Sequence, residues 1–500
     1  MSLRFSRTVT LGLGLVLTPV LAWAQAAQPS PTGQPAAKPA AQAAAPVEES
    51  TSIKLVLYPA AEPKPALKYQ LLPPLLERRP GNAAVHYGKV KSEQNHFFGN
   101  ADLQNKIADW ANGPLEKFPK EEARKALGAD SIFKTLERAA RCETCDWDLP
   151  IREEEFISMR LPEVQESRSF GRLLAAKARL QMADGQYDEA VRTLQTGYAL
   201  GRHVGQGPTI INGLVGITIC GVMSHQVRDL MQQPGTPSLY WALSNLPRPL
   251  VDMRPGFEAE MAMLYLSYPE LRDLEHKDYP PQYWQQLLDK MVERWQLWGD
   301  GRSSPELERL TGTAMVLRGY PMAKRALIAW GRKPGEVEAM PVAQVIMLYT
   351  MRTYDELRDD LFKWFALPLW EANPGLNKAE EDLKKAIVEG REVLPIAALL
   401  LPALRAASVA GARTDREIAV LRILEALRLY GAAHDGRLPD KLGDVTEAPI
   451  PNDPVTGKEF LYRKAGDTAV LDAQTPSGYS AQSLNWLPYE IKFAAKGKRP

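Results

Sequence analysis

Two closely spaced cysteines are the first residues in this 500-residue chain whose types and spacing point to chemistry. Cys142 and Cys145 form a CxxC pair, while Cys220 stands alone in an apolar stretch, where a small buried hydrophobic residue is expected. A CxxC pair can form a disulfide, act as a redox pair or supply two ligands to zinc.

The surroundings of the CxxC pair narrow these alternatives. A thioredoxin-like redox site needs a preceding strand, but residues 132–141 have a helical pattern. A zinc site needs two further ligands, and the sequence has no second CxxC and no paired histidine spacing. We therefore expect a structural disulfide between Cys142 and Cys145. Free thiols are the main alternative, and redox or metal chemistry is the least favoured.

The histidines and acidic runs offer little metal or catalytic patterning. His434 and Asp435 are adjacent, as in HD phosphohydrolases, but they lie at a helix end before Gly436, where a capping or turn role is expected. The runs 275–278 and 153–155 place charged residues side by side, and such neighbours rarely converge on one ion. The six histidines are scattered, at His86, His96, His203, His225, His276 and His434.

Short catalytic motifs are absent from the sequence. It has no GxSxG or HExxH motif, and Gly205-Gln-Gly207 lacks the GK[ST] ending of a phosphate loop. A nucleophile and a base can still meet through folding, and the histidines nearest this glycine-rich turn, His203 and His225, are the candidates for such a site. We predict no local catalytic, cofactor or metal site.

The first 24 residues have the three-part layout of a bacterial secretory signal peptide. Arg4 and Arg7 precede an uncharged apolar run, and Ala22-Trp-Ala24 gives small residues at alternate positions before the expected cleavage. An uncleaved N-terminal membrane anchor is the alternative. Further along, the best candidate span, 394–404, is too short and holds two prolines. The protein is therefore expected in the periplasm or cell envelope, or secreted.

Composition places the rest of the chain among ordinary globular proteins. Hydrophobic residues make up 45% and charged residues 24%, and 61 basic against 60 acidic residues give a net charge of +1. This balance favours neither nucleic acid nor an anionic membrane as a partner. More than half of residues 25–50 are Ala or Pro, which predicts a disordered linker.

The elements that would position any site are mostly helices. Residues 51–82 form a Pro-rich extended lead-in with one short strand, and 83–410 have helical periodicity interrupted by Pro, Gly or Asn. Residues 411–500 begin with a helix, continue into a hairpin and end in a basic tail. Trp284, Trp295 and Trp298 fall on one helical face and are expected in the core. The predicted fold is mainly α, an irregular and partly repeat-like multi-helix domain with a small C-terminal α+β module.

Residues 174–204 resemble one tetratricopeptide repeat. The family's Gly-x-Tyr-x-Glu-Ala turn is present as Gly185-Gln-Tyr187-Asp-Glu189-Ala190, with Ala178 and Leu194 at packing positions. The resemblance covers one helix pair and implies a helical surface that binds a protein or peptide. The residues expected on that surface are Tyr187, Tyr198, Arg202 and His203.

Residues 413–471 resemble the globular head of type II secretion major pseudopilins. The shared features are a helix, Gly436-Arg-Leu-Pro439, Pro451-Asn-Asp-Pro454 and a hairpin around Phe460-Leu-Tyr462, whereas the pseudopilin assembly leader is missing at Met1. The resemblance implies the fold of this module. The whole chain also looks like an uncharacterised group of long exported helical bacterial proteins.

Three functions are compatible with these patterns. The favoured one is an exported interaction or scaffold protein of the cell envelope that holds a protein or peptide on its helices. The alternatives are an envelope hydrolase with a non-local active site, and an accessory component of a secretion or pilus-like system.

Overall fold

The computed structural model describes residues 52–128, 130–152, 156, 159, 161–276, 279–298, 305–394 and 396–494. The expected signal peptide, the linker, the acidic run 153–155 and the basic tail 496–499 lie outside the described residues. The described chain is mainly helical with a small sheet near its C-terminal end, so the predicted fold class is confirmed.

The helices before residue 250 form one end of the molecule. They pack around the repeat-like pair, and a two-stranded parallel sheet joins two of their loops. They are α3 (Ala83–Glu93), α4 (Asn95–Gly99), α5 (Ala101–Asn112), α6 (Lys120–Ala126), α7 (Asp130–Ala140), α8 (Pro162–Ala183), α9 (Tyr187–Gly205), α10 (Ile210–Met231) and α11 (Tyr240–Ser244), with β2 (Arg79–Asn82) and β3 (Cys142–Thr144) and the 3₁₀ turns η1 (Leu75–Glu77) and η2 (Leu115–Lys117).

The helices from residue 254 to 400 form the other end. The helix over residues 305–329 is continuous through Pro321, which lies inside it. These elements are α12 (Arg254–Ser267), η4 (Pro269–Asp273), α13 (Pro281–Trp298), α14 (Pro305–Ala329), α15 (Pro334–Ala339), α16 (Val342–Phe362), α17 (Leu369–Val388) and α18 (Ile396–Leu400).

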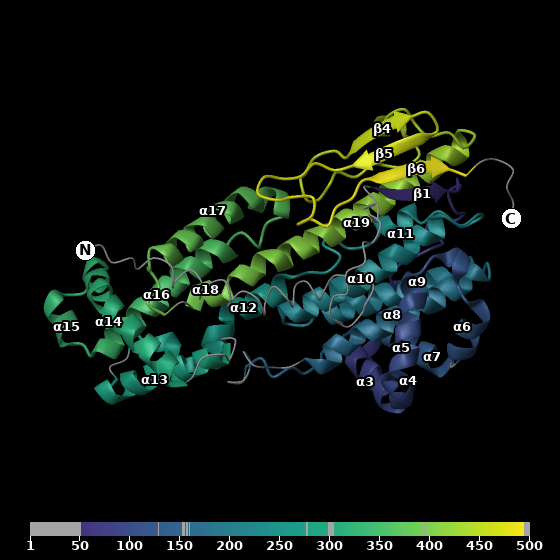
Figure 1. Ribbon diagram of the computed structural model, residues 1–500. Helices are drawn as coiled ribbons and strands as arrows, with labels where there is room; N and C mark the ends of the chain where they lie inside the picture. Colours follow the sequence, from purple (N-terminus) through teal and green to yellow (C-terminus); the bar gives the residue numbers. More distant parts are fainter. Residues whose placement is uncertain are drawn as a thin grey trace, which may run out of the picture.

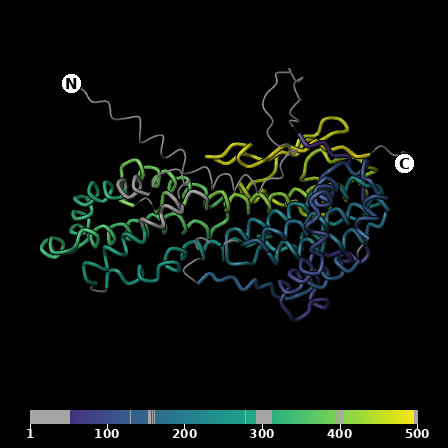
Figure 2. Tube along the Cα trace, turned by 60° about the horizontal axis from the view of Figure 1, so that its bottom comes forward, coloured from purple at the N-terminus to yellow at the C-terminus, as the bar shows by residue number. Residues whose placement is uncertain are grey.

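One long helix connects the two ends. α19 (Pro402–Ala433) starts beside α17 and α18 and continues along α10 toward the C-terminal sheet, which gives the molecule its elongated shape (Figure 1). The boundary expected between residues 410 and 411 falls inside this continuous helix. Figure 2 shows the same arrangement from a second direction, with the sheet along one side of the helical body.

The C-terminal sheet has four strands, and one of them comes from the N-terminal part of the chain. The strands are β1 (Ile53–Leu57), β4 (Leu461–Ala465), β5 (Thr468–Asp472) and β6 (Tyr489–Phe493). Their order is β1-β6-β5-β4, with β1 parallel to β6 and the other pairs antiparallel. The sheet packs on α19, where a Cβ on Gly431 would lie 2.6 Å from the ring of Phe493. The lead-in and the C-terminal module are therefore one structural unit.

The helices α8 and α9, which include the segment that resembles a tetratricopeptide repeat, pack closely on each other. α8 ends in a Schellman cap, because Gly185 has φ +72° and Gln186 N donates to Gln181 O at 2.8 Å. α9 also crosses α10 at close range. A Cβ on Gly216 of α10 would lie 2.5 Å from the carbonyl oxygen of Gly201 on α9. Glycine at this crossing lets the two backbones approach.

The most apolar helix of the described chain is α10 at the centre of this packing. By length and composition it is the one described helix suited to crossing a membrane, whereas the sequence pattern pointed to residues 394–404 as the best candidate. Just over half of its apolar window is buried, against α8, α9, α12 and α19. Its apolar character is therefore accounted for by its place in the core.

Candidate functional site

The residues expected on a partner-binding surface divide into two buried and two partly exposed side chains. Tyr198 is buried and hydrogen bonds Ser224 at 2.9 Å, and His203 is 7% exposed. Tyr187 and Arg202 are half-buried. A partner reaching this face would therefore meet Tyr187 and Arg202, while the other two side chains belong to the core.

His203 lies in a buried cluster of ring and cysteine side chains. Its Nδ1 is 3.0 Å from the hydroxyl of Tyr87, and its Nε2 is 3.1 Å from Cys142 O. Burial lowers the pKa of His203 to about 4, so the ring is neutral at pH 7. Because both ring nitrogens are occupied within the protein, His203 links α9 to α3 and β3.

The CxxC pair follows a helix directly, as the sequence predicted. Cys142 begins β3 after α7, and both cysteines are free thiols in the structure. Burial raises the pKa of Cys145 to about 12 and raises that of Cys142, so neither thiol is activated as a nucleophile. Among the described residues, no group of three or more His, Cys, Asp or Glu side chains is placed to hold a metal ion. The predicted disulfide stays a prediction.

The other candidate histidine, His225, lies beside a carboxylate in one cavity. His225 and Asp229 are one helical turn apart on α10 and line a cavity of about 250 Å³ with residues 112–116. Burial lowers the pKa of His225, which keeps the imidazole neutral. Asp229 pairs with the fully buried Arg179 of α8, which fixes its position. The i, i+4 spacing of a histidine and an aspartate is the sequence signal for this pair.

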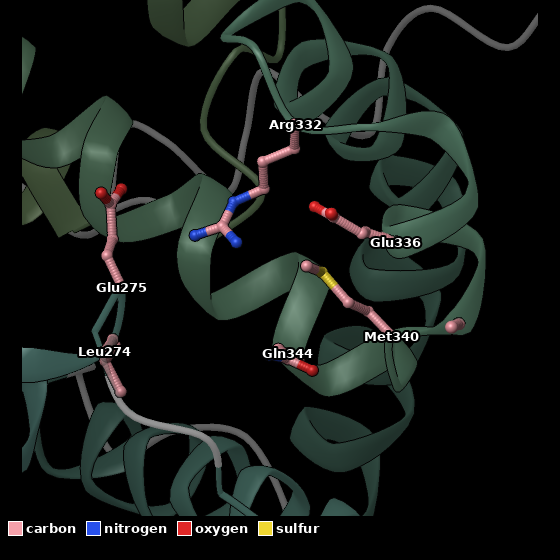
Figure 3. A pocket seen from close by; sticks show the side chains of 7 residues that line it. Leu274, Glu275, Arg332, Glu336, Met340 and Gln344 are labelled. Atoms are coloured by element: carbon pink, nitrogen blue, oxygen red, sulfur yellow. The ribbon is translucent and has the colours of Figure 1, made fainter.

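A second cavity lies at the other end of the molecule (Figure 3). Its volume is about 360 Å³, within the range of ~300–1,000 Å³ usual for ligand pockets. Three segments meet there: the end of η4, the α14–α15 turn with α15, and the first turn of α16. We call it the Arg332 cleft, and its lining residues are Leu274, Glu275, Arg332, Glu336, Ala339, Met340 and Gln344.

The position of Arg332 is set by the cap of α14. Gly331 has φ +104°, a conformation that favours glycine, and it follows directly on the last helical turn. Arg332 N donates to Leu327 O at 3.1 Å and Gly331 N donates to Ile328 O at 2.9 Å, which is the Schellman pattern. Pro334 then opens α15 at its first position. The short turn between the two helices thus holds the Arg332 backbone at the cleft.

Opposite charges face each other across the Arg332 cleft. Figure 3 shows the Arg332 guanidinium between Glu275 on one wall and Glu336 on the other. Among the described residues, neither Arg332 nor Glu275 has an ion-pair partner within 4 Å. Glu336 lies 3.5 Å from Lys333, whose side chain is 84% exposed, so this contact is a weak surface pair. The cleft therefore presents one cation and two anions with hydrogen-bonding capacity to spare.

The other lining residues complete a surface suited to an amphipathic group. Gln344 supplies an amide that can both donate and accept, while Leu274, Ala339 and Met340 supply apolar contact. Sequence reasoning did not find this site. The turn Gly331-Arg-Lys-Pro-Gly335 marks a helix stop and a helix start, but nothing local in it indicates Glu275 as its neighbour.

Comparisons with known proteins give no further identification. No family model, no curated protein and no solved structure matches this chain.

Proposed function

We propose that this protein is a polypeptide-binding scaffold of the cell envelope and that the Arg332 cleft anchors its partner. The observation that carries the proposal is a guanidinium and a carboxylate without ion-pair partners among the described residues, facing each other in a cavity of about 360 Å³. Charged groups of this kind, set beside apolar surface, suit the side chains and termini of a polypeptide. The sequence layout of residues 1–24 supports the envelope as the compartment.

The elongated architecture supports a scaffold role. The cleft lies at the α13–α16 end, while the repeat-like pair and the C-terminal sheet lie toward the other end (Figure 1). α19 connects both regions as one helix, because it packs on α17 and α18 at its start and on α10 further along.

Site-specific photo-crosslinking tests this proposal. A photoreactive residue replaces Met340 in the full-length chain, which is then illuminated in an extract of cell envelopes. We expect a defined crosslinked polypeptide that disappears when Arg332→Gln is added. The matched control is Lys106→Gln, which removes an exposed charge on α5 that pairs with Glu122, away from the cleft. Absence of a crosslink, or a crosslink unaffected by Arg332→Gln, would count against the proposal.

A second function is favoured by the cavity at His225. A neutral imidazole beside a fixed carboxylate can act as a general base toward a water molecule, which is a hydrolase chemistry. Activity profiling of the purified protein against ester, amide and phosphate substrates tests this alternative. Turnover that His225→Ala abolishes would support it, and turnover unchanged by His225→Ala would exclude this site.

A further inference from the structure

The charges of the Arg332 cleft indicate which charged groups of a polypeptide it can bind. A guanidinium binds a carboxylate through two parallel hydrogen bonds, so Arg332 is a natural partner for a ligand carboxylate. The carboxylate of Glu275 is a natural partner for an ammonium or guanidinium group. Glu275 is the better placed of the two glutamates for a ligand cation, because Glu336 already lies 3.5 Å from Lys333.

The size of the cleft limits how much of a polypeptide can enter. A volume of about 360 Å³ is at the lower end of ligand pockets, which favours one residue with its backbone over an extended segment. A single residue that carries both a carboxylate and a cation is found in a polypeptide only at its ends. At the C-terminus, a lysine or arginine has the α-carboxylate and a cationic side chain joined by a flexible apolar stem.

We propose that the Arg332 cleft binds the C-terminal residue of its polypeptide partner when that residue is lysine or arginine. The α-carboxylate lies on Arg332, and the side-chain cation lies on Glu275 across the opening (Figure 3). The methylene stem packs on Met340 and Leu274, and Gln344 is positioned for the ligand's last amide. This inference rests on the proposed function and adds the chemistry of the bound end.

Fluorescence anisotropy at low salt, with labelled hexapeptides and the full-length protein, tests the inference. The peptides share one sequence and end in lysine with a free carboxylate, in lysine amide, or in leucine with a free carboxylate. We expect the first to bind about tenfold or more tightly than either of the others, since each loses one charge-assisted contact. Low salt is needed because these groups are partly exposed and are screened at higher ionic strength.

Two variants assign the contacts in the same assay. With Arg332→Gln, the free-carboxylate and amide forms of the lysine peptide should bind equally. With Glu275→Gln, the peptides ending in lysine and in leucine should bind equally. Lys106→Gln, at the other end of the molecule, should leave all affinities unchanged. Circular dichroism of each variant shows whether it is folded.

The outcomes separate this inference from the proposed function. Equal binding of the lysine acid and lysine amide peptides by the unaltered protein would overturn recognition of the C-terminus while leaving polypeptide binding in place. Binding of free lysine, measured by calorimetry, without binding of any peptide would overturn the polypeptide function and support the charge assignment. If no probe binds, the inference is wrong.

Discussion

The ion pair between Arg428 and Glu425 on α19 provides a quantitative test of how the two ends of the chain are joined. Both side chains are 0% exposed, with Nη1 of Arg428 at 2.9 and 3.0 Å from the two carboxylate oxygens. The same guanidinium donates to Tyr58 O, directly after β1, at 2.8 Å, and to Thr236 O at 3.0 Å. One side chain thus connects the N-terminal strand, the loop before α11 and α19.

Replacing Arg428 by methionine removes all of these contacts and leaves the Glu425 carboxylate buried without its cation. Breaking a buried pair in this way costs about 3–5 kcal/mol of unfolding free energy. The orphaned carbonyl oxygens add to the loss, so we expect the upper part of that range for Arg428→Met. The double change Glu425→Leu with Arg428→Met removes the uncompensated charge and should be less destabilising than the single change.

Urea unfolding of the full-length chain, followed by tryptophan fluorescence and circular dichroism, measures these differences. The matched control is Lys106→Met, which breaks an exposed ion pair on α5 and should leave the midpoint unchanged. An Arg428→Met loss below about 1 kcal/mol, or a double variant less stable than the single one, would refute the reasoning.

Three further results are expected. Leu57→Ala should cost about 2–5 kcal/mol in urea unfolding, because Leu57 is fully buried in β1, whereas Val56→Ala on the exposed face should have little effect; equal effects would contradict the position of β1 in the sheet. Gly331→Ala should lower the free energy of unfolding by about 1–2 kcal/mol, because alanine is strained at the positive φ of this position. The same change should weaken binding of the lysine peptide, and unchanged binding would argue against the role of this cap. Burial raises the pKa of Glu260 from its usual 4.5 to about 7, so the folded state holds this proton more tightly, and stability should fall as pH rises from about 4.5 to 7 and then level off. Glu260→Gln should flatten the plot of unfolding midpoint against pH between about 4.5 and 7, and an unaltered slope would disprove the assignment.

Local features of the fold were predictable from the sequence because they depend on neighbouring residues. The turn at Gly185 follows from a glycine at a helix end and joins the two expected helices. The hairpin of β4 and β5 follows from the turn at Gly466 between two apolar runs. In each case the residues that determine the structure lie within a few positions of one another.

Features that depend on distant contacts were not predictable in the same way. The sequence predicts a short strand over residues 52–58, but the pairing of β1 with β6 joins segments more than four hundred residues apart, and β6 itself is not predicted. Strand propensity indicates that a segment will pair but does not name its partner. Likewise, Tyr198 and His203 were expected at a surface, but Tyr198 is buried against α10 and His203 is buried against α3 and β3.

The Arg332 cleft illustrates the same limit for function. The cap at Gly331 is a local signal, yet the approach of Glu275 depends on how the chain after η4 packs near α15 and α16. Charged residues at turns are common in any sequence. Only the fold shows that Arg332 and Glu275 share a cavity.

The most direct test of the central claim compares one peptide with two forms of the protein. The hexapeptide ending in lysine with a free carboxylate is titrated with the unaltered full-length chain and with Arg332→Gln under the same low-salt conditions. Loss of the guanidinium contact should weaken binding by about tenfold or more. Equal affinities for the two proteins would contradict the claim that the Arg332 cleft holds the polypeptide partner.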